Sequence, residues 1–273
     1  MKFCSTPSGT RVAYIYENSA VSENLRASPP LVLLHGFCED HLVWSPIKSL
    51  LKPQLLLVID LPGFGSSALP AHSDMTAYAE AVLAVLDVEN ITQCVLVGHS
   101  MGGYAALEFG ARWPERLAGL GLIHSHPFED SEERKTARRR GIETLQAGKR
   151  DLYVAQLFPN LFAPSFLEQN PDTLNELISN GKKQSPEGIA AALQAMLTRR
   201  DHQQTLRGTK CPVLFLLGTL DTLVTPEHGL KAALLPATSD LHLLPNVAHM
   251  AMYEYPEETA AILNSFWDFC EST

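Results

Sequence analysis

Short apolar runs recur along this chain, and the stretches between them carry apolar residues at helical spacing. A run that is apolar at every position is typical of a strand buried on both faces of a sheet. The turn-rich residues 7–10, between short runs at 2–4 and 11–16, predict an opening hairpin. Five clear buried runs and one weaker copy follow at Leu31–Leu34, Leu55–Ile59, Val95–Val97, Gly119–Ile123, Val213–Leu217 and, as the weaker copy, Leu241–Leu244. We therefore expect five or six buried strands in one sheet.

Helical stretches lie between these predicted strands. They include Met75–Leu86, Tyr104–Ala111, His228–Leu234 and Pro256–Phe269. Strand and helix in alternation predict the α/β fold class, with an open, mostly parallel sheet and helices on both faces. Ligands of such sheets bind outside the carboxyl ends of the strands. The residues directly after each apolar run are therefore the candidates for chemistry.

The alternation stops between residues 127 and 208, where helical patterns continue without a clear strand run. Ser185 and Pro186 have the residue types of a helix N-cap and first helical position. An apolar stripe follows at Ile189, Ala192, Leu193, Met196 and Leu197. We expect residues 127–208 to form a helical insert over the carboxyl edge of the sheet, and residues 1–126 and 209–273 to form the core. An insert in that place can act as a lid over a substrate pocket.

Charge and cysteine content narrow the class of protein. The 273 residues carry 21 basic and 30 acidic side chains, a formal net charge of -9. Because a nucleic-acid binder needs a positive field, nucleic-acid binding is not expected. The five cysteines are odd in number and form no Cys-x-x-Cys pair, which favours a reducing compartment. Residues 1–5 lack the apolar stretch of a secretory signal. The sequence also contains no run of about eighteen apolar residues, which stable insertion in a membrane would need. We expect a cytoplasmic protein.

Gly98–Gly103, with the sequence GHSMGG, is the strongest chemical signal. Gly-x-Ser-x-Gly between a strand and a helix is typical of a nucleophile elbow, a strained turn that lifts the serine above the sheet. The start of the following helix then directs its free N–H groups at the reacting centre. Ser100 is therefore the predicted nucleophile.

A serine nucleophile needs a base and an acid that orients the base. Asp221 lies just beyond the Val213–Leu217 run, and His249 lies just beyond the last, weaker run. Both therefore end predicted strands, as Ser100 does, so the three side chains can meet at one edge of the sheet. We predict that they act together.

The reaction also needs N–H donors for an oxyanion. The loop that starts with His35 and Gly36 follows the Leu31–Leu34 run, and its Phe37 N–H can pair with the Met101 N–H after the nucleophile. His35 itself is interpreted as a structural hydrogen-bonding residue, because His249 is better placed to act as the base.

In these motifs the chain resembles the α/β-hydrolase fold family, in its serine-nucleophile, carboxylesterase-like branch. The matching segments cover nearly the whole length and are His35–Phe37, Asp60–Ser67, Gly98–Gly103, Gly218–Asp221 and Val247–His249. The resemblance implies a sheet of about eight strands, a helical cap inserted after the sixth strand, a Ser100–Asp221–His249 triad and no cofactor. Haloalkane dehalogenases and epoxide hydrolases carry an aspartate nucleophile where this chain has Ser100, so the resemblance argues against these two branches of the family. Proline iminopeptidases usually have a more glycine-rich oxyanion loop, which makes peptidase activity a weaker hypothesis.

Three segments have competing interpretations. Glu129 and Asp130 are rivals of Asp221 for the triad acid, although the start of a helix attracts carboxylates for dipole reasons alone. His124 and His126 could share a face at a strand end and bind a metal, but no third ligand is evident, so structural or pocket-lining roles are favoured. Residues 60–65 lack the glycine spacing of a dinucleotide loop and are interpreted as a tight turn.

The substrate pocket is the least defined part of this prediction. Basic residues at 134–135 and 138–140 would bind an anionic substrate if they faced the pocket, but a solvated helix face is the favoured interpretation. Apolar residues of the insert either line an acyl site or pack the lid onto the sheet. The candidates for the pocket wall are His35, Cys38, His99, Phe158, Phe162, Phe166 and Met196.

The favoured function is hydrolysis of a small carboxylic ester through an acyl-enzyme, with neither metal nor cofactor. The same triad also serves carbon–carbon bond hydrolases, lyases of the menaquinone pathway and perhydrolases in the family that this chain resembles. A hydrolase-like receptor with little turnover is the alternative from another class. The expected partner is a small molecule, and the sequence does not specify an oligomeric state.

Overall fold

The computed structural model describes residues 1–18 and 28–272. Within these residues one sheet of eight strands has the order β1-β2-β4-β3-β5-β6-β7-β8. The strands are β1 (Lys2–Ser5), β2 (Arg11–Asn18), β3 (Leu31–Leu34), β4 (Leu55–Ile59), β5 (Cys94–His99), β6 (Leu117–Ile123), β7 (Val213–Gly218) and β8 (Ser239–Leu244). β2 pairs antiparallel with β1 and β4, and all other neighbours are parallel. The predicted fold class and the eight strands are confirmed.

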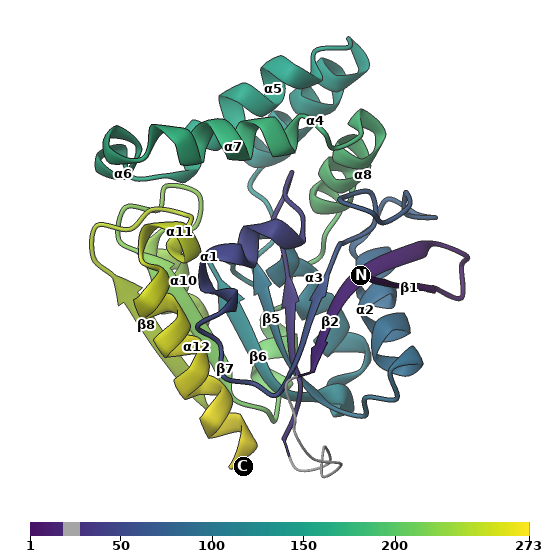
Figure 1. Ribbon diagram of the computed structural model, residues 1–273, viewed down its shortest axis with the longest axis vertical. Helices are drawn as coiled ribbons and strands as arrows, with labels where there is room; N and C mark the ends of the chain where they lie inside the picture. Colours follow the sequence, from purple (N-terminus) through teal and green to yellow (C-terminus); the bar gives the residue numbers. More distant parts are fainter. Residues whose placement is uncertain (19–27, 273) are drawn as a thin grey trace.

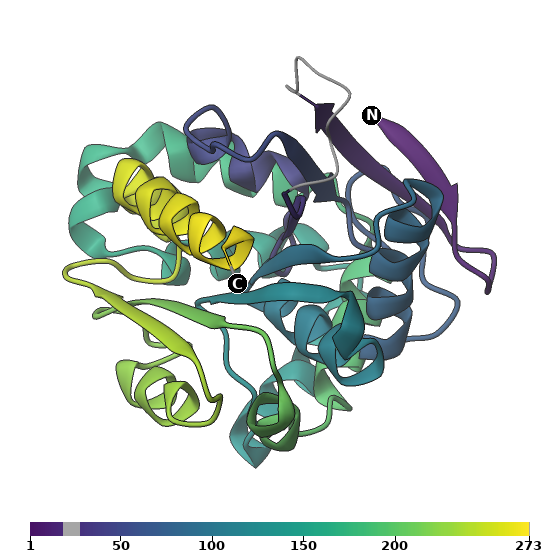
Figure 2. The same cartoon turned by 90° about the horizontal axis from the view of Figure 1, so that it is seen from below.

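The helices form layers on both faces of this sheet (Figures 1 and 2). α1 (Ser45–Lys48) and α12 (Pro256–Glu271) cover one face, with α11 (Ala251–Glu254) beside α12. α2 (Met75–Val88), α3 (Met101–Arg112) and α10 (Pro226–Ala233) cover the other face. The remaining helical segments of the core are the 3-10 turns η1 (His41–Trp44) and η2 (Pro114–Arg116).

The apolar runs became strands because both of their faces are covered. Every residue of β3, β5 and β7 is buried, as a strand between two helical layers must be. β6 contains glycine where α12 comes close, since a Cβ on Gly119 would lie 2.4 Å from Cys270 Sγ. After β4, the Asp60 carboxylate accepts hydrogen bonds from the backbone N–H groups of His41 and Ser66 and so closes the predicted turn.

All helices between β6 and β7 fall in the segment predicted as an insert. They are α4 (Glu132–Gln146), α5 (Arg150–Leu157), η3 (Phe158–Leu161), α6 (Pro164–Gln169), α7 (Pro171–Gly181), α8 (Pro186–Leu197) and α9 (Gln203–Gly208). The Ser185 hydroxyl accepts from the Gly188 N–H, which confirms the predicted start of α8. In Figure 1 α4 to α8 lie beyond the carboxyl ends of the strands, whereas α9 packs against α3. The His202 N–H donates to the Pro127 carbonyl at 2.7 Å, so the two ends of the segment meet.

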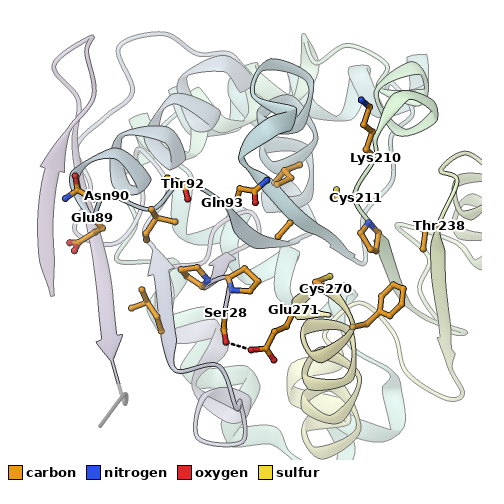
Figure 3. Close-up of a pocket in the computed structure, with 18 of the residues that line it drawn as sticks. Ser28, Glu89, Asn90, Thr92, Gln93, Lys210, Cys211, Thr238, Cys270 and Glu271 are labelled. Carbon is orange, nitrogen blue, oxygen red and sulfur yellow. Dashed lines mark hydrogen bonds between the residues drawn. The ribbon is translucent and has the colours of Figure 1, made fainter. Parts of the chain in front are cut away.

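Two cavities lie at opposite ends of the sheet. The larger, of about 1090 Å³, is at the amino ends of the strands, where Thr92, Cys211 and Thr238 border it (Figure 3). The smaller, of about 170 Å³, is at the carboxyl ends, beside Ser100. Of these two, the smaller cavity is at the end where sheets of this type bind ligands. In the described part of the chain, no helix combines the length and the apolar character needed to cross a membrane.

Candidate active site

Ser100 lies in a strained turn between β5 and α3. Its φ of 50° and ψ of -110° belong to a region that side-chain-bearing residues rarely adopt. The turn requires glycine on both sides, because a Cβ on Gly98 would lie 2.3 Å from the Gly102 backbone and one on Gly102 would lie 2.5 Å from the Leu34 carbonyl oxygen. The Ser100 N–H donates to the Ile123 carbonyl at 2.8 Å, which ties the turn to β6. The local sequence thus dictates a half-buried serine at the carboxyl edge of the sheet.

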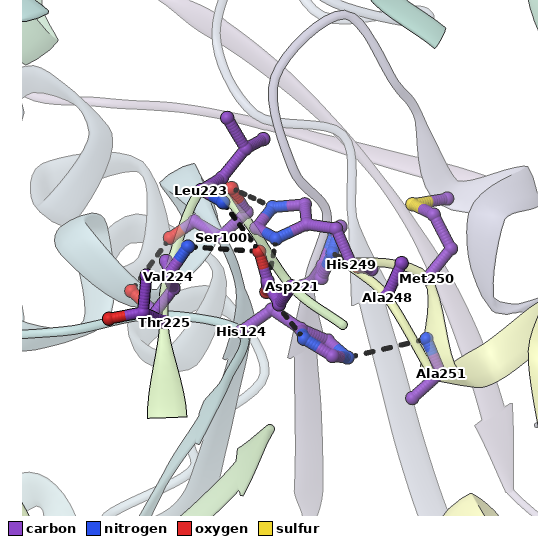
Figure 4. Close-up of polar contacts among 12 residues, drawn as sticks. Ser100, His124, Asp221, Leu223, Val224, Thr225, Ala248, His249, Met250 and Ala251 are labelled. Atoms are coloured by element: carbon purple, nitrogen blue, oxygen red, sulfur yellow. Dashed lines mark hydrogen bonds and ion pairs between the residues drawn. The ribbon is translucent and has the colours of Figure 1, made fainter. Parts of the chain in front are cut away.

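The structure brings Ser100, His249 and Asp221 into one hydrogen-bonded chain (Figure 4). Ser100 Oγ is 2.9 Å from His249 Nε2, and His249 Nδ1 is 2.7 Å from Asp221 Oδ2. Both distances suit a proton transfer from the hydroxyl to an imidazole that a carboxylate orients. Asp221 and His249 are both buried.

A partly buried carboxylate on α11 holds the loop that carries His249. Glu254 accepts hydrogen bonds from the backbone N–H groups of Ala248 and Met250, on either side of the histidine. Burial raises the pKa of Glu254, although these backbone donors act in the opposite direction. The His249 N–H donates to the Leu161 carbonyl of η3 at 2.8 Å, so the segment between β6 and β7 also contacts the loop. The sequence motifs did not indicate Glu254.

Asp221 has four hydrogen-bond donors around its carboxylate. Oδ1 accepts from the N–H groups of Leu223 and Val224 at 2.8 and 2.9 Å. Oδ2 accepts from His249 Nδ1 and, at 2.9 Å, from His124 Nδ1. Burial alone would raise the pKa of Asp221, but the two histidines and their hydrogen bonds outweigh it and hold the pKa well below its ordinary value. Asp221 is therefore an anion at neutral pH.

The rival acids lie elsewhere. Asp130 is buried and pairs with Arg138 and, at 2.6 Å, with Arg199. Burial opposes ionisation, but the two arginines lower the pKa of Asp130. The expectation that Asp130 belongs to an acidic helix start is wrong, because α4 begins at Glu132 behind the N-cap Ser131, and Asp130 anchors two arginines instead. Glu129 has a largely exposed side chain beside Lys135.

Another buried carboxylate, Glu39, lines the same cavity as Ser100. Glu39 Oε2 accepts from the Gly36 N–H at 2.6 Å and from His99 Nδ1 at 3.1 Å. His99 Nε2 donates to the His249 carbonyl at 2.9 Å, so both nitrogens of the ring carry hydrogen. Burial disfavours the charged form of each side chain, but their attraction raises the pKa of His99 and lowers that of Glu39. This ion pair connects the loop after β3, the serine turn and the His249 loop. The sequence motifs did not indicate Glu39.

Of the two residues predicted to supply oxyanion donors, one follows Ser100 in the chain and the other lines the same cavity. Met101 is the first residue of α3, so its N–H belongs to the helix turn that lacks intrahelical acceptors. Phe37 lines the small cavity together with Ser100. His35 is buried and has a structural role, because its Nδ1 donates to the Gly36 carbonyl and its Nε2 accepts from the Leu61 N–H.

The small cavity has a largely apolar wall with a few polar groups. Of the pocket candidates, only His99 and Met196 line it; the other lining residues include Phe37, Tyr104, Arg134, Arg138, Tyr153, Leu161, Leu193 and Leu223. The other five expected wall residues are not among those that line it, and their neighbours explain why. Cys38 is buried behind the loop, where burial raises the pKa of its thiol, and His35 binds backbone. Phe158 packs against Gly181, and Phe162 stacks on Phe166 at 5.2 Å between ring centroids.

Two of the basic residues on α4 face this cavity, so the expectation of a fully solvated face is wrong for them. Arg138 reaches inward to Asp130, and Arg134 donates to the Leu223 carbonyl beyond Asp221. Both residues are only partly exposed, whereas Arg139 and Arg140 are exposed. Asp130 pairs with both Arg138 and Arg199, so two guanidinium groups share one carboxylate, while Arg134 binds a neutral carbonyl. The wall above Ser100 is therefore positively charged.

His124 and His126 do not face a common point. His124 donates to Asp221, whereas His126 Nδ1 accepts from the Phe128 N–H and its ring stacks on His228. Burial and nearby arginines lower the pKa of His126 to about 3, so it is neutral. One group of possible metal ligands occurs among the described residues, His124 with Asp221 and His249, and hydrogen bonds between its members account for their closeness.

Comparison with known proteins identifies the family. A sequence model of the alpha/beta hydrolase family matches residues 31–262. The chain belongs to this family. It is thus an enzyme of the α/β-hydrolase fold, as the sequence motifs suggested.

Relatives of this α/β-hydrolase differ in their named activities. A 2-succinyl-6-hydroxy-2,4-cyclohexadiene-1-carboxylate synthase from Klebsiella pneumoniae (strain 342) is 28% identical over 90% of this chain and 96% of its own length. A thermophilic esterase from Thermogutta terrifontis, with malate bound, has a TM-score of 0.90 and 27% identity, covering 99% of this chain and 98% of its own. An enol-lactonase from Burkholderia xenovorans LB400 has a TM-score of 0.88 at 22% identity, covering 98% and 100%, and supports the fold alone.

Proposed function

We propose that this enzyme is a serine hydrolase that cleaves a carboxylic ester through an acyl-enzyme. The observation that carries this proposal is the hydrogen-bonded chain from Ser100 Oγ through His249 to Asp221, with distances of 2.9 and 2.7 Å. The esterase from Thermogutta terrifontis supports ester chemistry, since its chain matches this one along nearly the whole length.

In the proposed reaction Ser100 attacks the ester carbonyl while His249 Nε2 takes the hydroxyl proton. Asp221 stabilises the imidazolium that forms, because it accepts from Nδ1. The N–H groups of Phe37 and Met101 bind the oxyanion of the tetrahedral intermediate. His249 then gives its proton to the leaving alcohol and activates a water that hydrolyses the acyl-enzyme.

Residues 127–208 are proposed to act as a cap over this site. Support comes from Arg138, Tyr153 and Met196, all from this segment, which line the cavity beside Ser100. The cavity of about 170 Å³ is smaller than the ~300–1,000 Å³ of typical drug-sized sites, so we infer a small acyl group. Arg134 and Arg138 favour a substrate that carries a carboxylate, because guanidinium groups bind carboxylates well.

Hydrolysis of p-nitrophenyl esters tests this proposal. A panel of rising acyl length reports the acyl site, and mono-p-nitrophenyl succinate is compared with the neutral p-nitrophenyl pentanoate. We expect turnover that Ser100→Ala abolishes, labelling of Ser100 by a fluorophosphonate, and a preference for the succinate that Arg138→Gln removes. Arg139→Gln is the matched control, because Arg139 is exposed on the same helix. Ester turnover that Ser100→Ala leaves unchanged contradicts the proposal.

Elimination is a second candidate reaction. The Klebsiella relative is named as a synthase of a cyclohexadiene carboxylate, and the cationic wall of Arg134 and Arg138 would suit a substrate with that group. In this reaction His249, with Ser100 as its hydrogen-bonded partner, would remove a proton from a carbon next to the one that bears the leaving group. The C–H electron pair would form the new double bond, and the leaving group would depart with the electrons of its own bond. Fluorophosphonate labelling of Ser100 without turnover of any ester in the panel would favour this candidate over ester hydrolysis.

A further inference from the structure

His124 is the residue directly after β6, and its ring donates to Asp221. It is fully buried, and its φ of 48° lies in the left-handed region that residues other than glycine and asparagine seldom occupy. Its backbone N–H donates to the Leu216 carbonyl of β7 at 2.8 Å. Figure 4 shows the ring between Asp221 and Ala251. We propose that His124 is a positioning residue, which holds the Asp221 carboxylate in the one orientation that presents Oδ2 to His249.

The two ring contacts determine the tautomer of His124. Nε2 accepts from the Ala251 N–H at 3.3 Å, so it carries no hydrogen. The hydrogen is therefore on Nδ1, which donates to Asp221 Oδ2 at 2.9 Å. Burial lowers the pKa of His124 to about 4, although its bond to Asp221 opposes this, so the neutral form persists at neutral pH. His124 thus acts as a fixed neutral donor and leaves the imidazolium charge to His249.

The hydrogen bond from His124 matters because it goes to Asp221 Oδ2, the same oxygen that His249 contacts. Asp221 Oδ1 is already held by two backbone N–H groups, and His124 donates to Oδ2 together with His249, whose ring lies beside its own. The carboxylate then cannot rotate, so the direction of the His249 ring is determined. The second donor also shares the negative charge of Oδ2, which weakens the hold of Asp221 on a His249 imidazolium. This inference rests on the proposed hydrolase function of the same site.

Other charged and titratable groups near this carboxylate contribute to any pH effect. Those that face it or its two histidines are His99 with its partner Glu39, Glu254 on α11 and His228 on α10. None of them hydrogen-bonds Asp221 in the described structure. If the pH profile shifts only in variants that lack a hydrogen-bond donor at position 124, the shift is therefore due to the loss of that donor.

The experiment compares three variants of His124 in the full chain. His124→Asn keeps a donor of similar reach and tolerates the left-handed backbone, whereas His124→Leu removes the donor. His124→Gly also removes it and suits the backbone, which covers the case in which the leucine variant fails to fold. The readouts are kcat and KM per fluorophosphonate-titrated site and the pH profile of kcat/KM.

We expect kcat of the leucine and glycine variants to fall about 10- to 100-fold, the factor that one hydrogen bond to a charged group represents, with KM changed less than about 3-fold. The acid limb of their profile should move to higher pH by about half a unit or more, because Asp221 then holds the imidazolium more tightly. The asparagine variant should stay within about 3-fold of wild type.

Two outcomes overturn the inference, and a third overturns the function beneath it. A donor-free variant with wild-type kcat per titrated site contradicts a positioning role. A fall in kcat that is equal in all three variants, with an unmoved acid limb, indicates packing alone. If the wild-type enzyme itself gives no Ser100-dependent turnover of the ester panel, the hydrolase proposal fails first, and the inference fails with it.

Discussion

Replacing Asp221 with asparagine tests the proposed triad most directly, and the structure predicts which way the amide will lie. Oδ1 of the aspartate accepts from the N–H groups of Leu223 and Val224, so the amide oxygen must take that place. The NH₂ group then takes the place of Oδ2 and faces Nδ1 of both His249 and His124. Both rings must therefore accept a hydrogen bond at Nδ1 instead of donating one.

This reversal removes the base. A His249 ring that accepts at Nδ1 carries its hydrogen on Nε2, and Nε2 is the atom 2.9 Å from Ser100 Oγ. It cannot take the serine proton in that form, and no anion remains to stabilise an imidazolium. We expect kcat to fall by about 10⁴, or about 5.5 kcal/mol in activation free energy, as for other triads in which the tautomer is reversed.

Steady-state hydrolysis of the preferred p-nitrophenyl ester measures this loss, with thermal unfolding to show that the variant is folded. Asp130→Asn is the matched control, because Asp130 is the rival candidate for the triad acid, is also buried and pairs with Arg138 and Arg199. It should lower stability but change kcat for a neutral ester less than about 10-fold. If Asp130→Asn abolishes turnover while Asp221→Asn keeps more than about a tenth of it, the assignment of the triad acid is refuted.

Three further predictions test the surroundings of the site. Glu39→Gln should lower the free energy of unfolding by about 1–3 kcal/mol at pH 5.5 and by less at pH 9 in urea titrations. The pKa of His99 is raised, so the contribution of the ion pair to stability declines as pH rises above about 6.5. The pKa of Glu39 is lowered, so the contribution persists as pH falls to about 4.5. Equal losses of stability at pH 5.5 and pH 9 would contradict this. Glu108→Gln should cost about 2 kcal/mol at pH 7. Against the effect of burial, hydrogen bonds from His202 and Arg112 and the charge of Arg200 lower the pKa of Glu108 to about 2, and the exposure of the two arginines reduces the gain. That contribution is lost as pH falls from about 4.5 toward 2, so wild type and variant should converge there in urea titrations, and a constant difference would refute the reasoning. Gly98→Ala should prevent folding or lower the free energy of unfolding by more than about 3 kcal/mol, because its Cβ would lie 2.3 Å from the Gly102 backbone. Gly208→Ala is the control and should leave stability unchanged, because its Cβ would meet nothing within 4 Å. Thermal melts that show equal effects of the two substitutions would contradict the strained turn.

Elements that depend on residues close to one another in the sequence could be predicted with nearly correct bounds. The apolar runs at 31–34 and 55–59 became strands with the same bounds, and the start of α8 at Pro186 matches the predicted cap. The serine turn could also be predicted, because its backbone excludes side chains at the flanking glycines over only a few residues. The weaker run at 241–244 was the end of a strand that begins at Ser239, where polar residues at the edge of the sheet hid the pattern.

Groups that meet across the fold could not be predicted in this way. Glu39 and His99 are 60 residues apart, and Arg138 turns toward Asp130 and the cavity although its sequence neighbours are exposed. A run of charges does not indicate which of its members face inward, because this depends on the rotation of α4 over the sheet. The pocket candidates Phe158 and Phe162 have the residue types of an acyl site, but their packing partners keep them away from the cavity.

The sequence by itself determined the α/β alternation and the serine turn, and it placed Ser100, Asp221 and His249 after predicted strands, because hydrophobic period and turn sterics act over a few residues. Only the tertiary structure decided which carboxylate meets His249 and what His124 does. His124 and Asp221 are 97 residues apart and meet because β6 and β7 pair in parallel register and end side by side. Contacts of that kind depend on strand register and on the burial of charge.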